Sequence, residues 1–337
     1  MDATGTERRA RLPGGAGSPL HALLRPTPLL LAASVVFLLV GSLVSTIFAQ
    51  QTVAGLAQGA IFASLALALV LIYRATGVIN FAQGEMAMGT TYIAYQLTLW
   101  GLSYWLAFFC SLAIAFVLGA LIQVAVIRPV QHKSVIAVVI VTIGLFILID
   151  GLVAWRWGGD IKFMDAPFGN AVYHAGGVSF ARQDIGTLVV TVVSVLVLWA
   201  FFRFTKIGLG LRAGAVRPAA ARLVGVRVDA LLAVGWGLAA MLGAISGLMT
   251  EPSQFLQPTM MQPILLYAFA AAVLGGLESP AGSVVGGLAL GVFLNLIGQY
   301  VGFATSELRL PIAFAVLLGV LLLKPHGLFG RKEVRRV

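Results

Sequence analysis

The sequence predicts an all-α fold, a polytopic transmembrane helical bundle. Of its 337 residues 60% are hydrophobic and only 10% are charged, and the mean hydropathy is +0.99. A soluble domain carries about 25% charged residues, so this chain has too little charge to cover a water-facing surface. Its apolar residues also gather in runs of about 20, the length that crosses the hydrocarbon core as a helix.

Ten apolar runs predict about ten spans, with both chain ends in the cytoplasm (N-in/C-in). The first is expected to be a retained helix, because its apolar part exceeds the roughly 7–15 residues of a signal peptide. The third, eighth and ninth are interrupted by glycine or polar residues and are the weakest. The predicted spans are residues 28–49, 52–73, 77–100, 103–127, 134–154, 185–202, 230–250, 261–277, 281–302 and 308–323.

The basic residues support this orientation. All but four of the 22 Lys and Arg residues fall in segments that alternating spans place in the cytoplasm, which is the positive-inside pattern. Losing one weak span would put the basic segment 203–227 and the C-terminal tail on opposite sides, so eight or ten spans pass this test and nine does not. The net charge of +10 does not indicate nucleic-acid binding, because the basic residues lie in short segments between apolar runs.

The chain therefore divides into a cytoplasmic tail (1–27), a transmembrane domain (28–324) and a basic cytoplasmic tail (325–337). Within the membrane domain, residues 155–184 carry mixed charges and are expected to fold as an external loop. Residues 205–229 are expected in the cytoplasm. There, arginines at 212, 217 and 222 alternate with apolar residues at helical spacing, which predicts a short amphipathic helix with a break at Pro218.

Glu85 is a charged residue inside a predicted span, in the segment G-V-I-N-F-A-Q-G-E-M-A-M-G of residues 77–89. A carboxylate at mid-span costs about 2.5–3.5 kcal/mol on insertion scales, so it faces protein or water. One interpretation is a broken helix along a substrate path, in which Glu85 accepts hydrogen bonds from freed backbone N–H groups. The other is an interfacial turn with Glu85 at a helix N-terminus, where the dipole favours an anion. The two are compatible. The residues assigned to this path are Asn80, Phe81, Gln83, Gly84 and Glu85.

A second glycine-rich segment, residues 274–287, has the same character. Paired interrupted segments in two halves of a chain can mark a transporter's binding region, but glycines also let helix backbones approach closely. For Gly286, Gly287 and Gly291 we favour packing. The residues assigned to this late motif are Gly275, Gly276, Glu278, Gly282, Gly286 and Gly287.

Other kinds of chemistry find little support. No P-loop, H-E-x-x-H or G-x-S-x-G motif occurs, and Cys110 stands alone, so no metal, catalytic or cysteine redox site is expected. A membrane enzyme would need several polar residues converging on one cavity, and no such set is visible in the sequence.

Three segments resemble a known family, the permeases of branched-chain amino-acid ABC importers. Residues 77–89 resemble its G-x-I-N-F-A-x-G-E segment, residues 208–225 its coupling segment, and residues 271–287 its late A-A-V-L-G-G-L-G-S-x-x-G-A-x-x-G-G stretch, with a match over about 51–323. The chain departs from the pattern at Arg217-Pro218-Ala219, where an acidic residue is usual, at Glu278, where glycine is common, and at Gln83, where histidine is common.

The resemblance implies an importer permease in a bacterial inner membrane. Its expected partners are a second related permease subunit, two cytoplasmic ATPases that hydrolyse ATP, an external solute-binding protein and the lipid bilayer; no cofactor is expected in this chain. The implied substrate is a branched-chain or related amino acid. Related permeases of the same family carry urea or short amides. The residues assigned to ATPase coupling are Gly208, Arg212, Ala220 and Gly225. The alternative function is an ion- or proton-coupled secondary transporter that uses Glu85.

Overall fold

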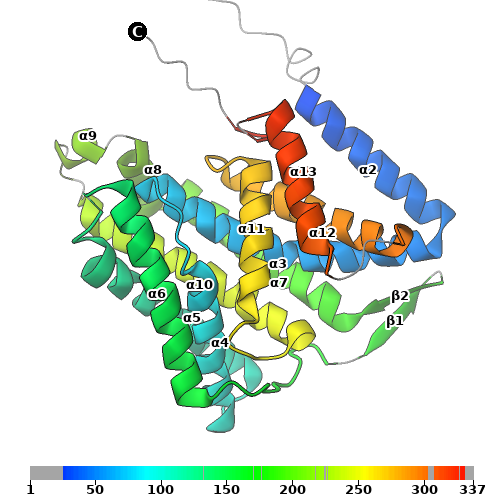
Figure 1. Cartoon of the computed structure of the whole chain (residues 1–337), viewed down its shortest axis with the longest axis horizontal. Coiled ribbons are helices and arrows are strands. Elements are labelled where there is room, and N and C mark those ends of the chain that lie inside the picture. Colours follow the sequence, from blue (N-terminus) through cyan, green and yellow to red (C-terminus); the bar gives the residue numbers. More distant parts are fainter. Residues whose placement is uncertain are drawn as a thin grey trace, which may run out of the picture.

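A computed structural model describes residues 26–330 except 132, 170, 176, 217, 224, 226, 303–306 and 326. The described chain is a bundle of helices with one short hairpin (Figure 1). The elements are α2 (Pro26–Val44), α3 (Thr46–Thr76), α4 (Gln83–Leu99), α5 (Tyr104–Ile122) continued by the π-helix η1 (Gln123–Ile127), α6 (Val135–Trp157), β1 (Val172–Ala175), β2 (Val178–Ala181), α7 (Arg182–Phe204), α8 (Lys206–Val216), α9 (Pro218–Leu223), α10 (Val228–Gln254), α11 (Met261–Gly275), α12 (Pro280–Tyr300) and α13 (Arg309–Leu323).

Each of the ten predicted spans corresponds to one helix. Within the described residues, six helices are long and apolar enough to cross a membrane: α3, α5 with η1, α6, α7, α10 and α12. Residues 34–43 of α2, together with α11 and α13, form shorter apolar helices. The structure is thus a membrane-type helical bundle, and the count of ten spans stays a prediction.

The ends of several elements differ from the sequence prediction. The break between the first two spans falls at Ser45, whose hydroxyl accepts from Phe48 N at 3.4 Å and caps α3, and not at residues 50–51. Helix α4 begins at Gln83 and not at 77, because residues 77–82 leave helical geometry. The predicted loop 155–184 is shorter, since α6 continues to Trp157 and α7 begins at Arg182, and it holds the antiparallel β1–β2 pair that an all-α prediction does not include.

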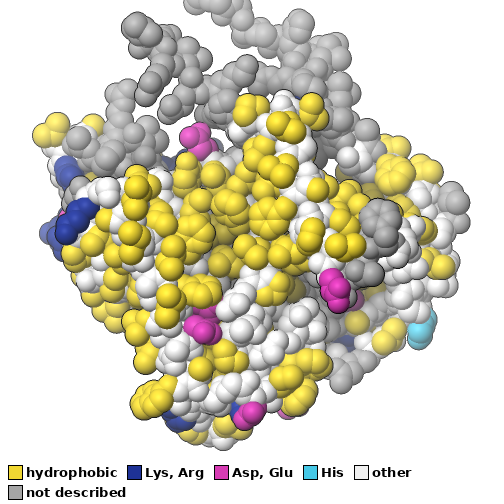
Figure 2. Space-filling model, viewed as in Figure 1, with side chains coloured by type: hydrophobic (Ala, Val, Ile, Leu, Met, Phe, Trp, Pro, Cys, Tyr) yellow, Lys and Arg dark blue, Asp and Glu magenta, His cyan; other side chains and the backbone are white. Residues whose placement is uncertain are grey.

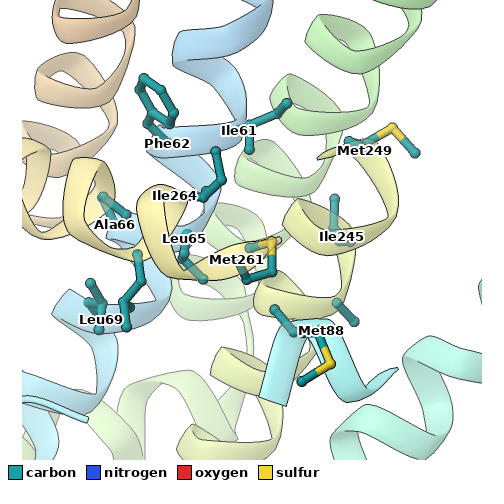
Figure 3. Close-up of a cluster of buried hydrophobic side chains, with 14 of the residues drawn as sticks. Ile61, Phe62, Leu65, Ala66, Leu69, Met88, Ile245, Met249, Met261 and Ile264 are labelled. Carbon is teal, nitrogen blue, oxygen red and sulfur yellow. The ribbon is translucent and has the colours of Figure 1, made fainter. Parts of the chain in front are cut away.

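Helix α3 lies at the centre of the bundle and packs against α12, α10, α11 and α7. Most of α3 is buried: 83% of its most apolar 18-residue stretch lies inside the protein. Figure 3 shows part of the core that it forms with α4, α10 and α11, where Phe62, Leu65, Met88, Ile245 and Met261 pack together. Two hydroxyls also join α3 to α10, since Ser64 donates to Leu242 O at 3.1 Å and Ser246 donates to Ile61 O at 3.2 Å.

Helices α6 and α7 have the opposite character. Only 17% of the most apolar 18-residue stretch of α6 is buried, and 22% of that of α7. Large side chains such as Ile140, Ile147 and Leu196 are more than half exposed. This is the surface expected of helices that face lipid. An apolar cavity of about 380 Å³ lies between α6 and its neighbours α4 and α5, so α6 is loosely packed on that side.

Figure 1 shows where the ends of the helices lie, and the alternation of spans stays a prediction. In Figure 1 the start of α2, the end of α13 and helices α8 and α9 lie along the upper side, whereas the loop after α6 and the hairpin lie along the lower side. Which side faces the cytoplasm remains a prediction from the basic residues.

Candidate functional site

A polar break separates α3 from α4 inside the protein. Gly77 ends α3 in the left-handed conformation (φ 73°) and its N–H donates to Tyr73 O at 2.7 Å. In the break that follows, Asn80 is fully buried. Its Oδ1 accepts from Ala82 N at 3.1 Å and its Nδ2 donates to Gln83 Oε1 at 3.2 Å. Asn80 thus supplies the partners that the interrupted helix has lost, as irregular backbone at membrane depth requires.

Gln83 attaches this break to α10. Its Nε2 donates to Ala239 O at 2.9 Å, and the side chain is fully buried. The Gln83 side chain can approach the backbone of α10 because residue 243 is glycine. A Cβ at that position would lie 2.7 Å from Gln83 Nε2. The glutamine that stands in place of the common histidine therefore has a defined structural role, the cross-link between the break and α10.

Glu85 lies in the first turn of α4, as the interfacial interpretation predicts. The expectation that it accepts hydrogen bonds from freed backbone N–H groups is wrong: it is fully buried, and within the described residues neither Oε1 nor Oε2 has a hydrogen-bond partner. Asn80 takes that role instead. The Gln262 amide of α11 lies near the Glu85 carboxylate, and Asp150 of α6 lies within electrostatic range of it.

Two further residues assigned to the path differ in their surroundings. A Cβ at Gly84 would lie 3.2 Å from Leu265 Cβ and 3.4 Å from Met261 O, so this glycine permits the close approach of α11. Phe81 is 39% exposed, unlike the buried polar residues beside it. The structure therefore brings Asn80, Gln83, Gly84 and Glu85 together between α10 and α11, and leaves Phe81 outside.

Sequence reasoning missed two acidic residues of the membrane domain. Asp150 was the single charged residue in the predicted span 134–154, a signal of the same kind as Glu85. Glu251 follows the predicted span 230–250 directly and is 1% exposed; its Oε1 accepts from Met164 N at 2.9 Å, which ties the end of α10 to the loop after α6.

The late motif is a packing motif. A Cβ at Gly286 would lie 2.4 Å from Ala271 O, and one at Gly287 would lie 2.5 Å from Ala63 Cα. Gly275 and Gly282 face each other, and a Cβ on either would meet the other's carbonyl oxygen. The close approach of α12 to α11 and α3 at these glycines leaves no room for side chains. Packing was the interpretation favoured for Gly286 and Gly287.

The turn between α11 and α12 is the interruption in this second segment. Gly276 occupies it with φ 101°, and Glu278 is exposed there, so Glu278 does not enter a buried site. A segment near the end of the described chain pairs with this region, since Leu328 N donates to Leu274 O at 2.8 Å and Phe329 N donates to Gly275 O at 3.2 Å.

The segment assigned to ATPase coupling forms two helices, α8 and α9, with the break where Pro218 predicts it. Gly208 lets α8 turn back on α7, because its Cβ would lie 2.5 Å from Phe201 O. Arg212 is half-buried and Ala220 exposed, and Gly225 follows α9 with φ 84°. Arg217 lies outside the described residues.

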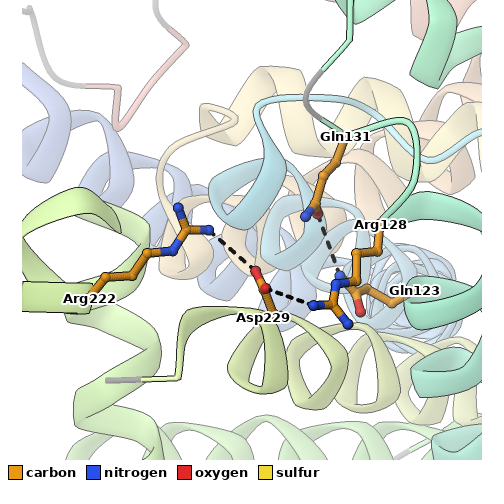
Figure 4. A network of polar contacts seen from close by, with 5 residues as sticks. All are labelled: Gln123, Arg128, Gln131, Arg222 and Asp229. Carbon is orange, nitrogen blue, oxygen red and sulfur yellow. Dashed lines mark hydrogen bonds and ion pairs between the residues drawn. The ribbon is translucent and has the colours of Figure 1, made fainter. Parts of the chain in front are cut away.

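An ionic network joins this segment to the turn after η1 (Figure 4). Asp229, in the first turn of α10, accepts from Arg128 Nη2 at 3.2 Å and from Arg222 Nη2 at 3.3 Å. Gln123 of η1 donates to Gln131 at 3.5 Å beside it. Asp229 thereby links α9, α10 and the turn between η1 and α6. The sequence signal for this network is the lone acid Asp229 next to a basic segment.

Comparisons with known proteins identify the family. The model of the family described as "Branched-chain amino acid transport system / permease component" matches residues 51–323. The high-affinity branched-chain amino acid transport system permease protein LivH of Salmonella typhimurium is 30% identical over 307 residues, which cover 86% of this chain and 98% of LivH. BraD of Pseudomonas aeruginosa, a permease protein of the same description, is 29% identical over 86% of this chain and 98% of its own length.

A probable branched-chain amino acid transport permease protein LivH of Methanocaldococcus jannaschii is 29% identical, over 79% of this chain and 87% of its own length. Among solved structures, a chain of PsaBC from Streptococcus pneumoniae in complex with Fab gives a TM-score of 0.47 at 15% identity, covering 87% of this chain and 97% of that one, which is too weak to show a common fold. The family match extends over most of the chain, and the chain therefore belongs to the branched-chain amino acid transport permeases, as a multi-pass membrane protein.

Proposed function

We propose that this chain is the membrane-spanning permease subunit of an ABC importer, and that it carries branched-chain or related amino acids across a bacterial inner membrane. The relatives named as branched-chain amino acid permeases support the substrate class. The observation that carries the proposal is the buried polar break at residues 77–85, which is attached to α10 by Gln83 and bordered by α11. Interrupted helices at membrane depth line cavities or substrate paths in transporters.

The proposed partners are a second related permease subunit, two cytoplasmic ATPases and an external solute-binding protein. The chain has no P-loop sequence, so ATP would bind to and be hydrolysed by the partner subunits. Helices α8 and α9 would receive their motion, since they form a basic segment that the Asp229 network ties to both α10 and the turn after η1. Motion of α9 would then reach α10, the helix that holds Gln83.

Uptake by reconstituted proteoliposomes tests the proposal. The importer is assembled from this chain and its neighbouring permease, ATPase and binding-protein gene products, with ATP enclosed and radiolabelled leucine outside. We expect uptake that requires both ATP and the binding protein and that an imposed pH gradient alone does not drive. Uptake driven by the gradient without ATP would reject the ABC assignment.

A second candidate is a proton- or ion-coupled carrier, and one observation favours it. Glu85 is a buried carboxylate without a hydrogen-bond partner in the described chain, and such groups within a membrane mark ion or proton pathways. In that case Glu85→Gln would abolish gradient-driven uptake and leave substrate exchange intact. The same proteoliposomes, with a pH gradient and no ATP, distinguish the two candidates.

A further inference from the structure

Helices α4 and α6 meet along one face of α4. A Cβ at Gly89 would lie 3.3 Å from Ile149 Cγ2, and one turn further on the rings of Tyr92 and Trp157 are 5.4 Å apart. Residues 85, 89 and 92 share a face of a helix because they are four and three positions apart. Glu85 and Tyr92 therefore flank the contact with Ile149, and Asp150 follows Ile149 directly on α6.

Several polar atoms at this contact between α4 and α6 lack hydrogen-bond partners among the described residues. Within the described chain, the two carboxylate oxygens of Glu85, Asp150 Oδ1 and the Tyr92 hydroxyl are buried and make no hydrogen bond of good geometry, although the Gln262 amide of α11 lies near Glu85. Asp150 lies within electrostatic range of both Glu85 and Tyr92. An unsatisfied buried polar group is costly, and a charged one more so, so a native protein places a partner at such atoms.

The contact between α4 and α6 has too few hydrogen-bond donors. Three carboxylate oxygens need hydrogen-bond donors or positive charge. The Tyr92 hydroxyl can offer one hydrogen, and the Gln262 amide lies near Glu85 only. A single proton shared by the two carboxyl groups would leave oxygens without a partner. A hard metal ion such as Ca²⁺ takes about six to eight oxygen ligands, more than the five side-chain oxygens of Glu85, Asp150 and Tyr92. A primary ammonium group carries three N–H donors and no acceptor.

We propose that Glu85 and Asp150 bind the α-ammonium group of the amino-acid substrate as it passes through the membrane domain. The inference rests on the proposed function and adds the contact that distinguishes an amino acid from its deaminated analogue. Charge-assisted hydrogen bonds from the ammonium group would satisfy the carboxylate oxygens. Asp150 is half-buried and Glu85 is fully buried, so the substrate would meet Asp150 first. Figure 2 shows that the face of the molecule in this view is largely apolar, with few acidic side chains.

Leucine binding to the purified permease–ATPase complex tests this without the solute-binding protein, which selects its own ligand. Binding of radiolabelled leucine is measured with 3-methylbutylamine, which keeps the ammonium group, and with 4-methylpentanoate, which lacks it, as competitors. We expect the amine to compete and the acid not to. Glu85→Gln and Asp150→Asn should each weaken leucine binding about tenfold or more. Asp160→Asn, which removes a carboxylate from an exposed loop, should not.

The outcomes separate this inference from the proposed function. Unchanged leucine binding in both variants, with ATP-dependent uptake intact in the wild type, would overturn the ammonium site and leave the importer assignment standing. Binding that requires Na⁺ and ignores the amine would also overturn it, in favour of a metal ion at the pair. If the Glu85→Gln variant does not give a monodisperse complex, leucine binding by the Asp150→Asn variant tests the ammonium site. Asp150 is half-buried, so its replacement disturbs the fold less.

Discussion

The Asn80 side chain is one of the groups that order the break between α3 and α4. Its side chain accepts from Ala82 N and donates to Gln83 Oε1, so it replaces helix hydrogen bonds that the break has removed. We expect Asn80→Ala to lower the free energy of unfolding, since each buried group left unpaired costs about 1–3 kcal/mol. Thermal unfolding in detergent measures this. Gln254→Ala, which removes an exposed amide, serves as the control, and equal unfolding temperatures for the two variants would contradict the role of Asn80.

At the scale of single residues, the sequence predicted which side chains matter better than it predicted what they contact. Asn80, Gln83 and Glu85 stand out because they are polar within an apolar run. Their partners come from α10, α11 and α6, and no local pattern specifies which carbonyl or carboxylate tertiary packing brings to them. This is why hydrogen bonds were assigned to Glu85 that Asn80 makes instead.

At the scale of elements, close packing of α3 and α12 depends on small residues. A Cβ at Gly291 would lie 2.3 Å from Gly59 Cα. Gly291→Ala should therefore push the helices apart and destabilise the protein by about 1–3 kcal/mol, the usual cost of overpacking. Gly144 on α6 is the matched control, because a Cβ there meets nothing within 4 Å. Gly144→Ala should be neutral or stabilising, given the better helix propensity of alanine. Thermal unfolding of the two variants gives the comparison.

The coupling segment offers a second prediction at this scale. Gly225 has φ 84° with no atom near its missing Cβ, so backbone conformation and not space limits substitution there. Gly225→Val should distort the link between α9 and α10 and abolish leucine uptake and the stimulation of ATPase activity, while the protein still inserts. Gly225→Asn should retain much of both, because asparagine tolerates the left-handed region. Full coupled transport by the valine variant would exclude this link from coupling.

The ends of elements were less predictable than their existence. The pair Gln50-Gln51 looked like the polar boundary between two spans, but both residues lie within α3 and the chain turns at Ser45 instead. A capping hydroxyl decided the boundary over the polarity of the side chains. Similarly, the β-hairpin lies in a segment whose mixed charges indicated a folded loop but carried no strand pattern.

At the scale of the whole molecule, the basic residues predict which side faces the cytoplasm. Cysteines introduced at Asp165 and at Ala220, in a chain with Cys110 replaced by alanine, test this in intact cells with a membrane-impermeant maleimide. We expect labelling of the Asp165→Cys variant and none of the Ala220→Cys variant until the membrane is permeabilised, because the positive-inside pattern places 205–229 in the cytoplasm. Labelling of Ala220→Cys from outside would reverse the orientation.

The length of α3 has a consequence for the lipid environment. Its 31 residues extend about 46 Å at 1.5 Å per residue, well beyond a hydrocarbon core of about 30 Å. A helix of this length either tilts or extends beyond the hydrocarbon core, and in Figure 1 it crosses α11 and α13 at a steep angle. Because other helices surround α3, lipid acyl chains do not contact its excess length. Bilayer thickness is instead matched by α6 and α7, whose 23 residues each reach about 35 Å, so hydrophobic mismatch would strain the loosely held α6 first and leave the central α3–α12 pair undisturbed.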